Sequence, residues 1–264
     1  MALQRTPTQI PYLTKIKSLA SGNNHVLALD VQGRVHAWGT GEQNQLGRRI
    51  LEGKLRFNCL TPARLGLSKI KQIACGAFHN FAINEKGLVY SWGLNNFGQA
   101  GISDGAGDGD AVVEKPTIVE GLRQYKIRDI QGGEHHSVAC TEDGTLLFWG
   151  RCDEGQAGIS LDTVPKDNLV FNDRNQPKIL NVPTVVPTVS DVVSVAAAID
   201  NSFAITKEGK AYAWGYSENY RTGLATEDTV KVPTLLERGD MKGKKINFAD
   251  CGGQFSVLAG VSED

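Results

Sequence analysis

Short apolar runs separated by glycine-containing turns follow one another along the whole chain. In a representative unit, an apolar run at residues 80–83 is followed by a turn ending at Gly87 and by a second run at 88–92. Runs of this length, rich in β-branched and aromatic residues, predict strands, and a turn carrying glycine predicts a tight antiparallel hairpin. The same pattern predicts further hairpins at 26–38, 137–149 and 203–214.

Another apolar run precedes each hairpin, at residues 16–20, 70–75, 127–131 and 192–197. These runs lack strict alternation, which is typical of strands covered on both faces. Pro-Thr pairs follow three of the hairpins, at 116–117, 183–184 and 233–234. They indicate an outer edge strand, where the missing proline N–H costs least. Four strands per unit are therefore predicted, and the chain ends in a partial unit with strands at 246–251 and 255–259.

A five-position repeat underlies these units. Its anchors are four Trp-Gly pairs, separated by 54, 57 and 65 residues, at Trp38, Trp92, Trp149 and Trp214. Glycines stand five residues before and nine residues after every anchor, and a polar ring or amide stands thirteen before, at His25, His79, His136 and Asn201. A glycine stands sixteen before in three copies, but the fourth copy has Ala198. Because the spacings are kept, insertions fall in one loop per unit.

Four short strands at a period of this size predict an all-β fold, a β-propeller of four blades plus a partial blade. We expect one domain over residues 1–264, with repeats at about 15–68, 69–125, 126–190 and 191–245 and a partial repeat at 246–264. Since the chain ends inside the fifth copy, we expect another segment to complete that blade. An open ring would expose unpaired strand edges.

Composition narrows the function classes. The formal charge of −1 argues against phosphate-backbone binding as the main task. Five cysteines without a CxxC pair argue against a zinc or disulfide framework and favour free thiols in a reducing compartment. The first residues lack the apolar core of a signal peptide, and no apolar run approaches the roughly 20 residues that span a bilayer. We therefore expect a soluble intracellular protein with no membrane contact.

Four segments carry a resemblance to a known family: 41–48 (GEQNQLGR), 91–98 (SWGLNNFG), 132–137 (GGEHHS) and 251–256 (CGGQFS). With the repeat G-x-x-H…G-x-V-x-x-W-G…Q-x-G, the chain resembles the regulator of chromosome condensation family in its fungal form. The resemblance implies a seven-bladed ring whose C-terminal blades are matched here. It implies a nuclear, chromatin-associated guanine-nucleotide exchange factor for the small GTPase Ran. It also implies that the N-terminal blades, a basic tail and a GTPase-facing wedge precede this part, so chromatin or histone contacts are expected there.

The histidines at the fixed repeat position are interpreted as structural. Recurrence in every blade indicates a hydrogen bond that ties neighbouring blades together rather than a metal site, because the position is Asn201 in the fourth copy and Phe255 in the fifth.

The residue just before that position follows no repeat rule, and it lies on a loop expected at the top rim of the central channel, where recognition is usually built. These rim residues are Asn24, Phe78, His135, Asp200 and Gln254. By resemblance, His135 matches a histidine that contacts the GTPase and supports exchange, and Arg48 matches an interface arginine. Asn24 stands where the family often has aspartate, and Phe255 where vertebrate members have a second interface histidine. Phe78 and Gln254 are expected rim neighbours.

Several alternatives remain open on the sequence alone. Arg48 could be a solvated loop cation and His135 a rim hydrogen-bond donor. The acidic stretch 104–110 resembles a calcium loop but lacks the twelfth-position glutamate, so a flexible acidic loop is the preferred interpretation. Residues 41–47 are not a phosphate-binding loop, and no nucleophile elbow or HExxH motif occurs. No cofactor or metal is expected, and the sequence gives no hydrolase or transferase motif. A non-catalytic propeller scaffold is the rival function, with another kind of enzyme as a weaker third.

Overall fold

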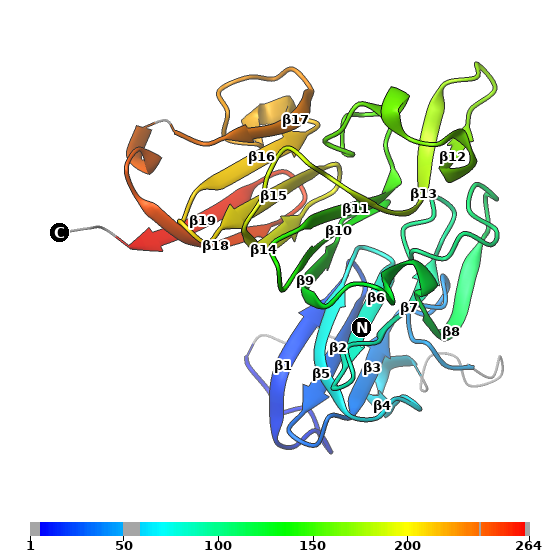
Figure 1. Cartoon of the computed structure of the whole chain (residues 1–264). Helices are drawn as coiled ribbons and strands as arrows, with labels where there is room; N and C mark the ends of the chain where they lie inside the picture. Colours follow the sequence, from blue (N-terminus) through cyan, green and yellow to red (C-terminus); the bar gives the residue numbers. More distant parts are fainter. Residues whose placement is uncertain (1–5, 50–58, 238, 262–264) are drawn as a thin grey trace.

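The computed structural model describes residues 6–49, 59–237 and 239–261, and its regular elements are almost all β-strands. The strands form four blades and a two-stranded fifth sheet (Figure 1). Blade 1 has the order β1 (Ile16–Ser21), β2 (His25–Asp30), β3 (Val35–Gly39), β4 (Ala63–Arg64). Blade 2 has the order β5 (Ile70–Cys75), β6 (His79–Asn84), β7 (Val89–Leu94), β8 (Val112–Ile118).

Blade 3 is the largest sheet because its long loop contributes a fifth strand. Its chain order is β9 (Ile127–Gly132), β10 (His136–Thr141), β11 (Leu146–Arg151), β12 (Leu169–Phe171) and β13 (Pro177–Val185), with β13 paired to both β11 and β12. Blade 4 has the order β14 (Val192–Ala197), β15 (Asn201–Thr206), β16 (Ala211–Gly215), β17 (Val230–Leu235). The last sheet pairs β18 (Lys245–Cys251) with β19 (Ser256–Val261).

Short 3-10 turns occupy the connections between strands. They are η2 (Glu120–Leu122), η3 (Leu161–Thr163), η4 (Lys166–Asn168), η5 (Glu218–Tyr220) and η6 (Gly239–Met241). Among the described residues, none of the helical segments has the length and apolar character needed to cross a bilayer.

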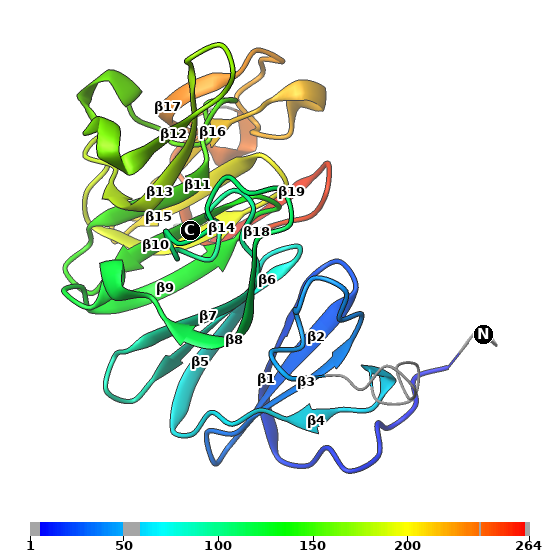
Figure 2. The ribbon, with the colours of Figure 1, turned by 90° about the vertical axis from the view of Figure 1, so that its right-hand side faces the viewer.

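The predicted propeller architecture is confirmed. The inner strands β1, β5, β9, β14 and β18 lie side by side in chain order, and the blades spread outward from them (Figures 1 and 2). Two of the Pro-Thr pairs fall in β8 and β17, the outer edge strands of blades 2 and 4, as predicted. The third falls in β13, which in blade 3 has the short strand β12 on its outer side. Two predicted strand starts are one residue early. Leu88 lies outside β7, and Phe255 lies outside β19, because the tight turn before it closes with a bond from the Gly252 N–H to the Phe255 carbonyl of 2.9 Å. Strand β12 was not predicted, since it is three residues long and lies in the variable loop.

The hydrophobic cores lie between blades rather than inside them. Each core combines side chains of consecutive blades, as where Leu27 of β2 and Ile73 of β5 share a cluster with Trp92. Trp92, Trp149 and Trp214 are fully buried. Each indole Nε1 donates to a carbonyl in the loop of the preceding blade, Trp92 to Gln45 at 2.8 Å, Trp149 to Gln99 at 2.9 Å and Trp214 to Gln156 at 2.7 Å. Trp38, which has no preceding blade in this chain, is only half-buried.

The fixed histidines tie each blade to the next one, as predicted. The contacts are His25 Nε2 with Asn80 Oδ1 at 2.7 Å, His79 Nε2 with Ser137 Oγ at 2.7 Å, and His136 Nε2 with Ser202 Oγ at 2.8 Å. Ser137 Oγ uses its one hydrogen on the carbonyl of Gln99 at 2.9 Å, so it must accept from the His79 Nε2–H. His79 is therefore a buried, neutral donor, and burial lowers the pKa of His136 to about 4 and that of His79 to about 3.

Candidate protein-binding rim

A repeated backbone contact fixes the rim residues. The residue after each Trp-Gly pair donates its N–H to the carbonyl of a rim residue: Thr40 to Asn24 at 2.7 Å, Leu94 to Phe78 at 3.0 Å, Arg151 to His135 at 2.8 Å, and Tyr216 to Asp200 at 2.9 Å. The glycine of each pair permits this approach. Gly150 has φ of +105°, and a Cβ there would lie 2.6 Å from the His135 carbonyl oxygen. The repeat thus holds the backbone of the rim constant and leaves its side chains free to vary.

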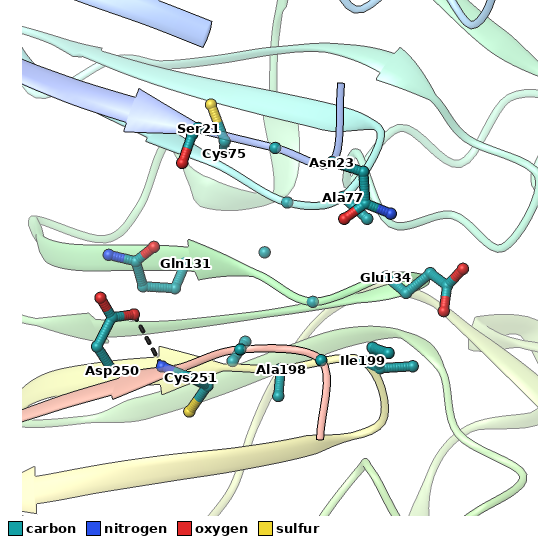
Figure 3. Close-up of a pocket in the computed structure, with 17 residues that line it drawn as sticks. Ser21, Asn23, Cys75, Ala77, Gln131, Glu134, Ala198, Ile199, Asp250 and Cys251 are labelled. Carbon is teal, nitrogen blue, oxygen red and sulfur yellow. Dashed lines mark hydrogen bonds between the residues drawn. The ribbon is translucent and has the colours of Figure 1, made fainter. Parts of the chain in front are cut away.

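The rim loops are also linked to one another around the axis. The Asn23 N–H donates to the Ala77 carbonyl at 3.1 Å, the Ala77 N–H to the Gly133 carbonyl at 2.9 Å, and the Glu134 N–H to the Ile199 carbonyl at 3.2 Å. Together the loops line a hollow of about 230 Å³ on the propeller axis, bounded by all five sheets (Figure 3). Nine of its 17 lining residues are glycine or alanine, and Asn23, Gln131, Glu134 and Asp250 add polar side chains to the backbone groups.

His135 lies in a group of aromatic and charged side chains on this rim. Its imidazole stacks on the ring of Phe97, with centroids 4.5 Å apart and planes 23° apart. Two cations lie over the same phenyl ring, Lys178 Nζ at 5.0 Å and Arg151 Cζ at 5.7 Å from its centroid. Contacts of this kind are attractive because the ring face carries negative charge. The group joins the loop of blade 2 to strands β11 and β13 of blade 3.

Carboxylates hold Arg151 in place. Its Nε bonds Asp153 Oδ1 at 2.6 Å, and a terminal nitrogen lies 3.8 Å from Asp200 Oδ1. Asp200 also accepts from Gln156 Nε2 at 3.0 Å, which connects blade 4 to the same network. A cation fixed by two carboxylates and an aromatic face keeps little rotamer freedom, so it can contact a partner at a low entropy cost.

Burial lowers the pKa of His135 below its ordinary value. The Glu134 carboxylate opposes that shift, whereas the positive charge of Arg151 adds to it. The imidazole is therefore neutral near neutral pH. Its Nδ1 is buried and, among the residues that the structure describes, has no hydrogen-bond partner.

The other predicted rim residues lie in the turns and loops of the other blades, outside the His135 group. Asn24 is exposed in the β1–β2 turn, and Phe78 is half-buried in the β5–β6 turn. Gln254 and Phe255 form the exposed tip of the β18–β19 turn, with 64% of Phe255 accessible. Arg48 is half-buried in the β3–β4 loop of blade 1, two blades away from His135.

Four members of the His135 group were not predicted as site residues: Phe97, Arg151, Lys178 and Asp200. Asp200 occupied the variable rim position, which was a usable signal. Phe97 stands two residues before the repeat glutamine Gln99, where the copies differ, but sequence spacing could not show that it reaches His135 from another blade.

No metal site emerges. Across residues 6–49, 59–237 and 239–261, no group of three or more His, Cys, Asp or Glu side chains could hold a metal ion. Asp104, Asp108 and Asp110 of the acidic stretch are exposed and do not converge. All five cysteines are free; four are buried and Cys251 is half-buried. Burial raises the pKa of the Cys140 and Cys152 thiols to about 12.

The Trp-Gly pairs and the histidines recur at the same places in successive blades around one axis, so the chain is a β-propeller built from a distinctive repeat. Comparison with known proteins identifies that repeat. A family profile described as "RCC1-like domain" matches residues 1–258, and the chain belongs to this family, the regulator of chromosome condensation repeats.

Individual relatives support the assignment. The chain is 42% identical to Protein pim1 of Schizosaccharomyces pombe, over 97% of this chain and 47% of that protein. It is 41% identical to guanine nucleotide exchange factor SRM1 of Saccharomyces cerevisiae, over 98% of this chain and 54% of that protein. The crystal structure of Prp20p from Saccharomyces cerevisiae superposes with a TM-score of 0.93 at 39% identity, covering 99% of this chain and 60% of the other. The chain therefore spans about half the length of the curated relatives it matches.

Proposed function

We propose that this chain is the GTPase-binding part of a guanine-nucleotide exchange factor for the small GTPase Ran. The rim centred on His135 is its contact surface. The observation that carries the proposal is the group formed by Phe97, His135 and Arg151, in which aromatic and cationic side chains from two blades converge on one face. Aromatic residues and arginine dominate the energetically important parts of protein interfaces. The similar yeast protein is named a guanine nucleotide exchange factor, and the similar crystal structure is described with its binding to Gsp1p and histones.

Exchange of this kind requires no covalent chemistry. A protein that binds the nucleotide-free GTPase more tightly than the loaded form weakens nucleotide binding by the same factor, because the two equilibria are linked. His135 and Arg151 would contact the GTPase directly, with Asn24, Arg48, Phe78, Gln254 and Phe255 as surrounding contacts. A nuclear, chromatin-associated location, with histones as further partners, is part of the same proposal.

The test is release of a fluorescent guanine nucleotide from Ran, together with the affinity of the chain for nucleotide-free Ran. We expect His135→Ala to weaken affinity and slow release about tenfold or more, as expected for a central interface residue contributing about 1.4 kcal/mol. His36→Ala is the matched control. His36 lies on β3, away from the rim loops, where its Nε2 is 3.6 Å from Asp30. Equal effects of the two substitutions would contradict the proposed contact surface.

A non-catalytic propeller scaffold remains the second candidate, because the same rim could bind a protein without changing its nucleotide affinity. Binding of Ran in all nucleotide states with one affinity, and no acceleration of release, would favour the scaffold. The same assay on a longer version of the protein separates a scaffold from an exchange factor whose remaining blades are required.

A further inference from the structure

The contact between Phe97 and His135 is made across a blade boundary. Phe97 comes from the β7–β8 loop of blade 2, whereas His135 ends the β9–β10 turn of blade 3. The loop holds Phe97 firmly, since its N–H donates to Gln99 Oε1 at 2.8 Å and Gly98 turns the chain at φ of +67°. The ring geometry lies in the offset-stacked range that aromatic pairs prefer. His135 is therefore supported on a surface that its own blade does not supply.

The surroundings of this pair favour one protonation form. Lys178 Nζ and Arg151 Cζ already lie 5.0 and 5.7 Å from the Phe97 centroid, so a third positive charge on the same ring would be repelled. Burial, the largest influence, lowers the pKa of His135, whereas the carboxylates of Glu134 and Asp200 and a backbone hydrogen bond with Glu134 raise it. A protonated imidazole would also place an N–H at the buried Nδ1, which has no well-aligned acceptor among the described residues. An unpaired buried donor is rarer than an under-used acceptor. The neutral form with its hydrogen on Nε2 avoids both penalties.

We propose that Phe97 is a positioning residue for His135: its ring holds the imidazole with Nδ1 inward and presents the Nε2–H to an acceptor oxygen of the bound GTPase. The structural histidine His79 uses the same arrangement, with Nδ1 buried and Nε2 donating to Ser137 of the next blade. At His135 that donor faces a partner protein instead of a serine. The inference about the role in binding rests on the proposed function, whereas the inference about the imidazole does not.

Nuclear magnetic resonance of the chain labelled with ¹⁵N at histidine tests the imidazole directly. The chain has five histidines, and His135→Ala assigns the relevant signals. We expect His135 to show the Nε2–H tautomer and to stay neutral as the pH falls through about 6.5, the ordinary histidine pKa. In Phe97→Ala its pKa should rise toward the ordinary value and the tautomers should mix. Phe97→Tyr, which keeps the ring, should behave like the unsubstituted chain. Phe97→Leu, which keeps apolar volume without the ring, should behave like Phe97→Ala.

An Nδ1–H tautomer in the unsubstituted chain would overturn the inference. So would an unchanged His135 pKa and tautomer in both Phe97→Ala and Phe97→Leu. The signals of the remaining histidines report whether each variant keeps the propeller, since three of them bridge blades.

Affinity for nucleotide-free Ran tests the positioning role. Phe97→Ala should weaken binding about two- to tenfold, the range that an aromatic pair contributes, and Phe97→Tyr should stay within about twofold. Phe97→Ala should weaken binding less in the His135→Ala chain than in the unsubstituted chain, because only the contact of its ring with Arg151 is then left to lose. Additive losses would contradict the positioning role. If His135→Ala itself leaves Ran binding unchanged, the proposed contact surface fails while the resonance result still decides the imidazole.

Discussion

Asn201 occupies in blade 4 the position that histidine holds in blades 1 to 3, and it is a local weakness. It is fully buried, and neither atom of its amide has a hydrogen-bond partner among the residues that the structure describes. The acceptor that a histidine at position 201 would reach is present. It is Ser256, which follows Phe255 in the fifth copy, and its Oγ donates to the Arg221 carbonyl at 2.9 Å. This is the arrangement that Ser137 makes in blade 3.

The residue sixteen before the tryptophan explains why histidine is absent there. A Cβ added to the glycines of the first three copies would lie 2.6–2.7 Å from the histidine Nδ1, at Gly22, Gly76 and Gly133. The fourth copy has Ala198 at that position, so its methyl group occupies the space of the missing ring. Ala198 in place of glycine and Asn201 in place of histidine are therefore parts of one structural change.

Restoring the repeat by Ala198→Gly together with Asn201→His should stabilise the chain. The new hydrogen bond contributes about 1 kcal/mol, and removing a buried unpaired amide contributes about 1–3 kcal/mol. The glycine costs about 0.5–1 kcal/mol in backbone freedom. We expect a net gain of about 1–3.5 kcal/mol in the free energy of unfolding. Asn201→His alone should destabilise by about 1–3 kcal/mol through overpacking, and Ala198→Gly alone by about 1 kcal/mol.

Urea and thermal unfolding of the unsubstituted chain, the two single variants and the double variant measure the coupling between Ala198 and Asn201. Each kcal/mol gained raises the melting temperature by about 2–4 °C in a domain of this length. The coupling energy between the two sites should be at least about 3 kcal/mol, at the upper end for neighbouring residues. Additive effects, or a double variant less stable than either single variant, would refute the steric link between Ala198 and Asn201.

Two further predictions concern the same interblade bonds. Gly133→Ala should destabilise by about 2 kcal/mol or more, measured by urea unfolding, because its Cβ would lie 2.7 Å from His136 Nδ1. A change below about 0.5 kcal/mol, the size typical of an unstrained surface substitution, would contradict this expectation. Stability should also fall as the pH drops from about 6.5, the ordinary histidine pKa, toward about 4. In this window His79 and His136, with pKa values of about 3 and about 4, stay neutral when folded but take up protons when unfolded. The unfolded chain then binds more protons, so each histidine lowers the free energy of unfolding by about 1.4 kcal/mol per pH unit. Urea midpoints at neutral pH and at successively lower pH measure this loss, and a shallower dependence in His79→Gln identifies its source.

The sequence by itself determined the blades. A hairpin with a glycine in its turn and a tryptophan at its end is a local pattern. Four copies with equal internal spacing stack on one another, because a single unit cannot bury its apolar face alone. The interblade role of His79 also followed from recurrence alone, because a residue repeated in every unit serves the contact that every unit makes. Phe255 was misplaced by one position, since a turn and a strand start look alike in an apolar sequence.

Only the tertiary structure decided which side chains meet. Phe97 and His135 are 38 residues apart and belong to different blades, so nothing in their local patterns links them. Ala198 and Asn201 were visible as two exceptions to the repeat, but their common cause is a clash that exists only when the ring folds over the preceding turn. Repeat spacing fixes the backbone of every blade, whereas the distances between side chains of neighbouring blades depend on how the blades pack. That is why the fold could be predicted from the sequence and the composition of the rim could not.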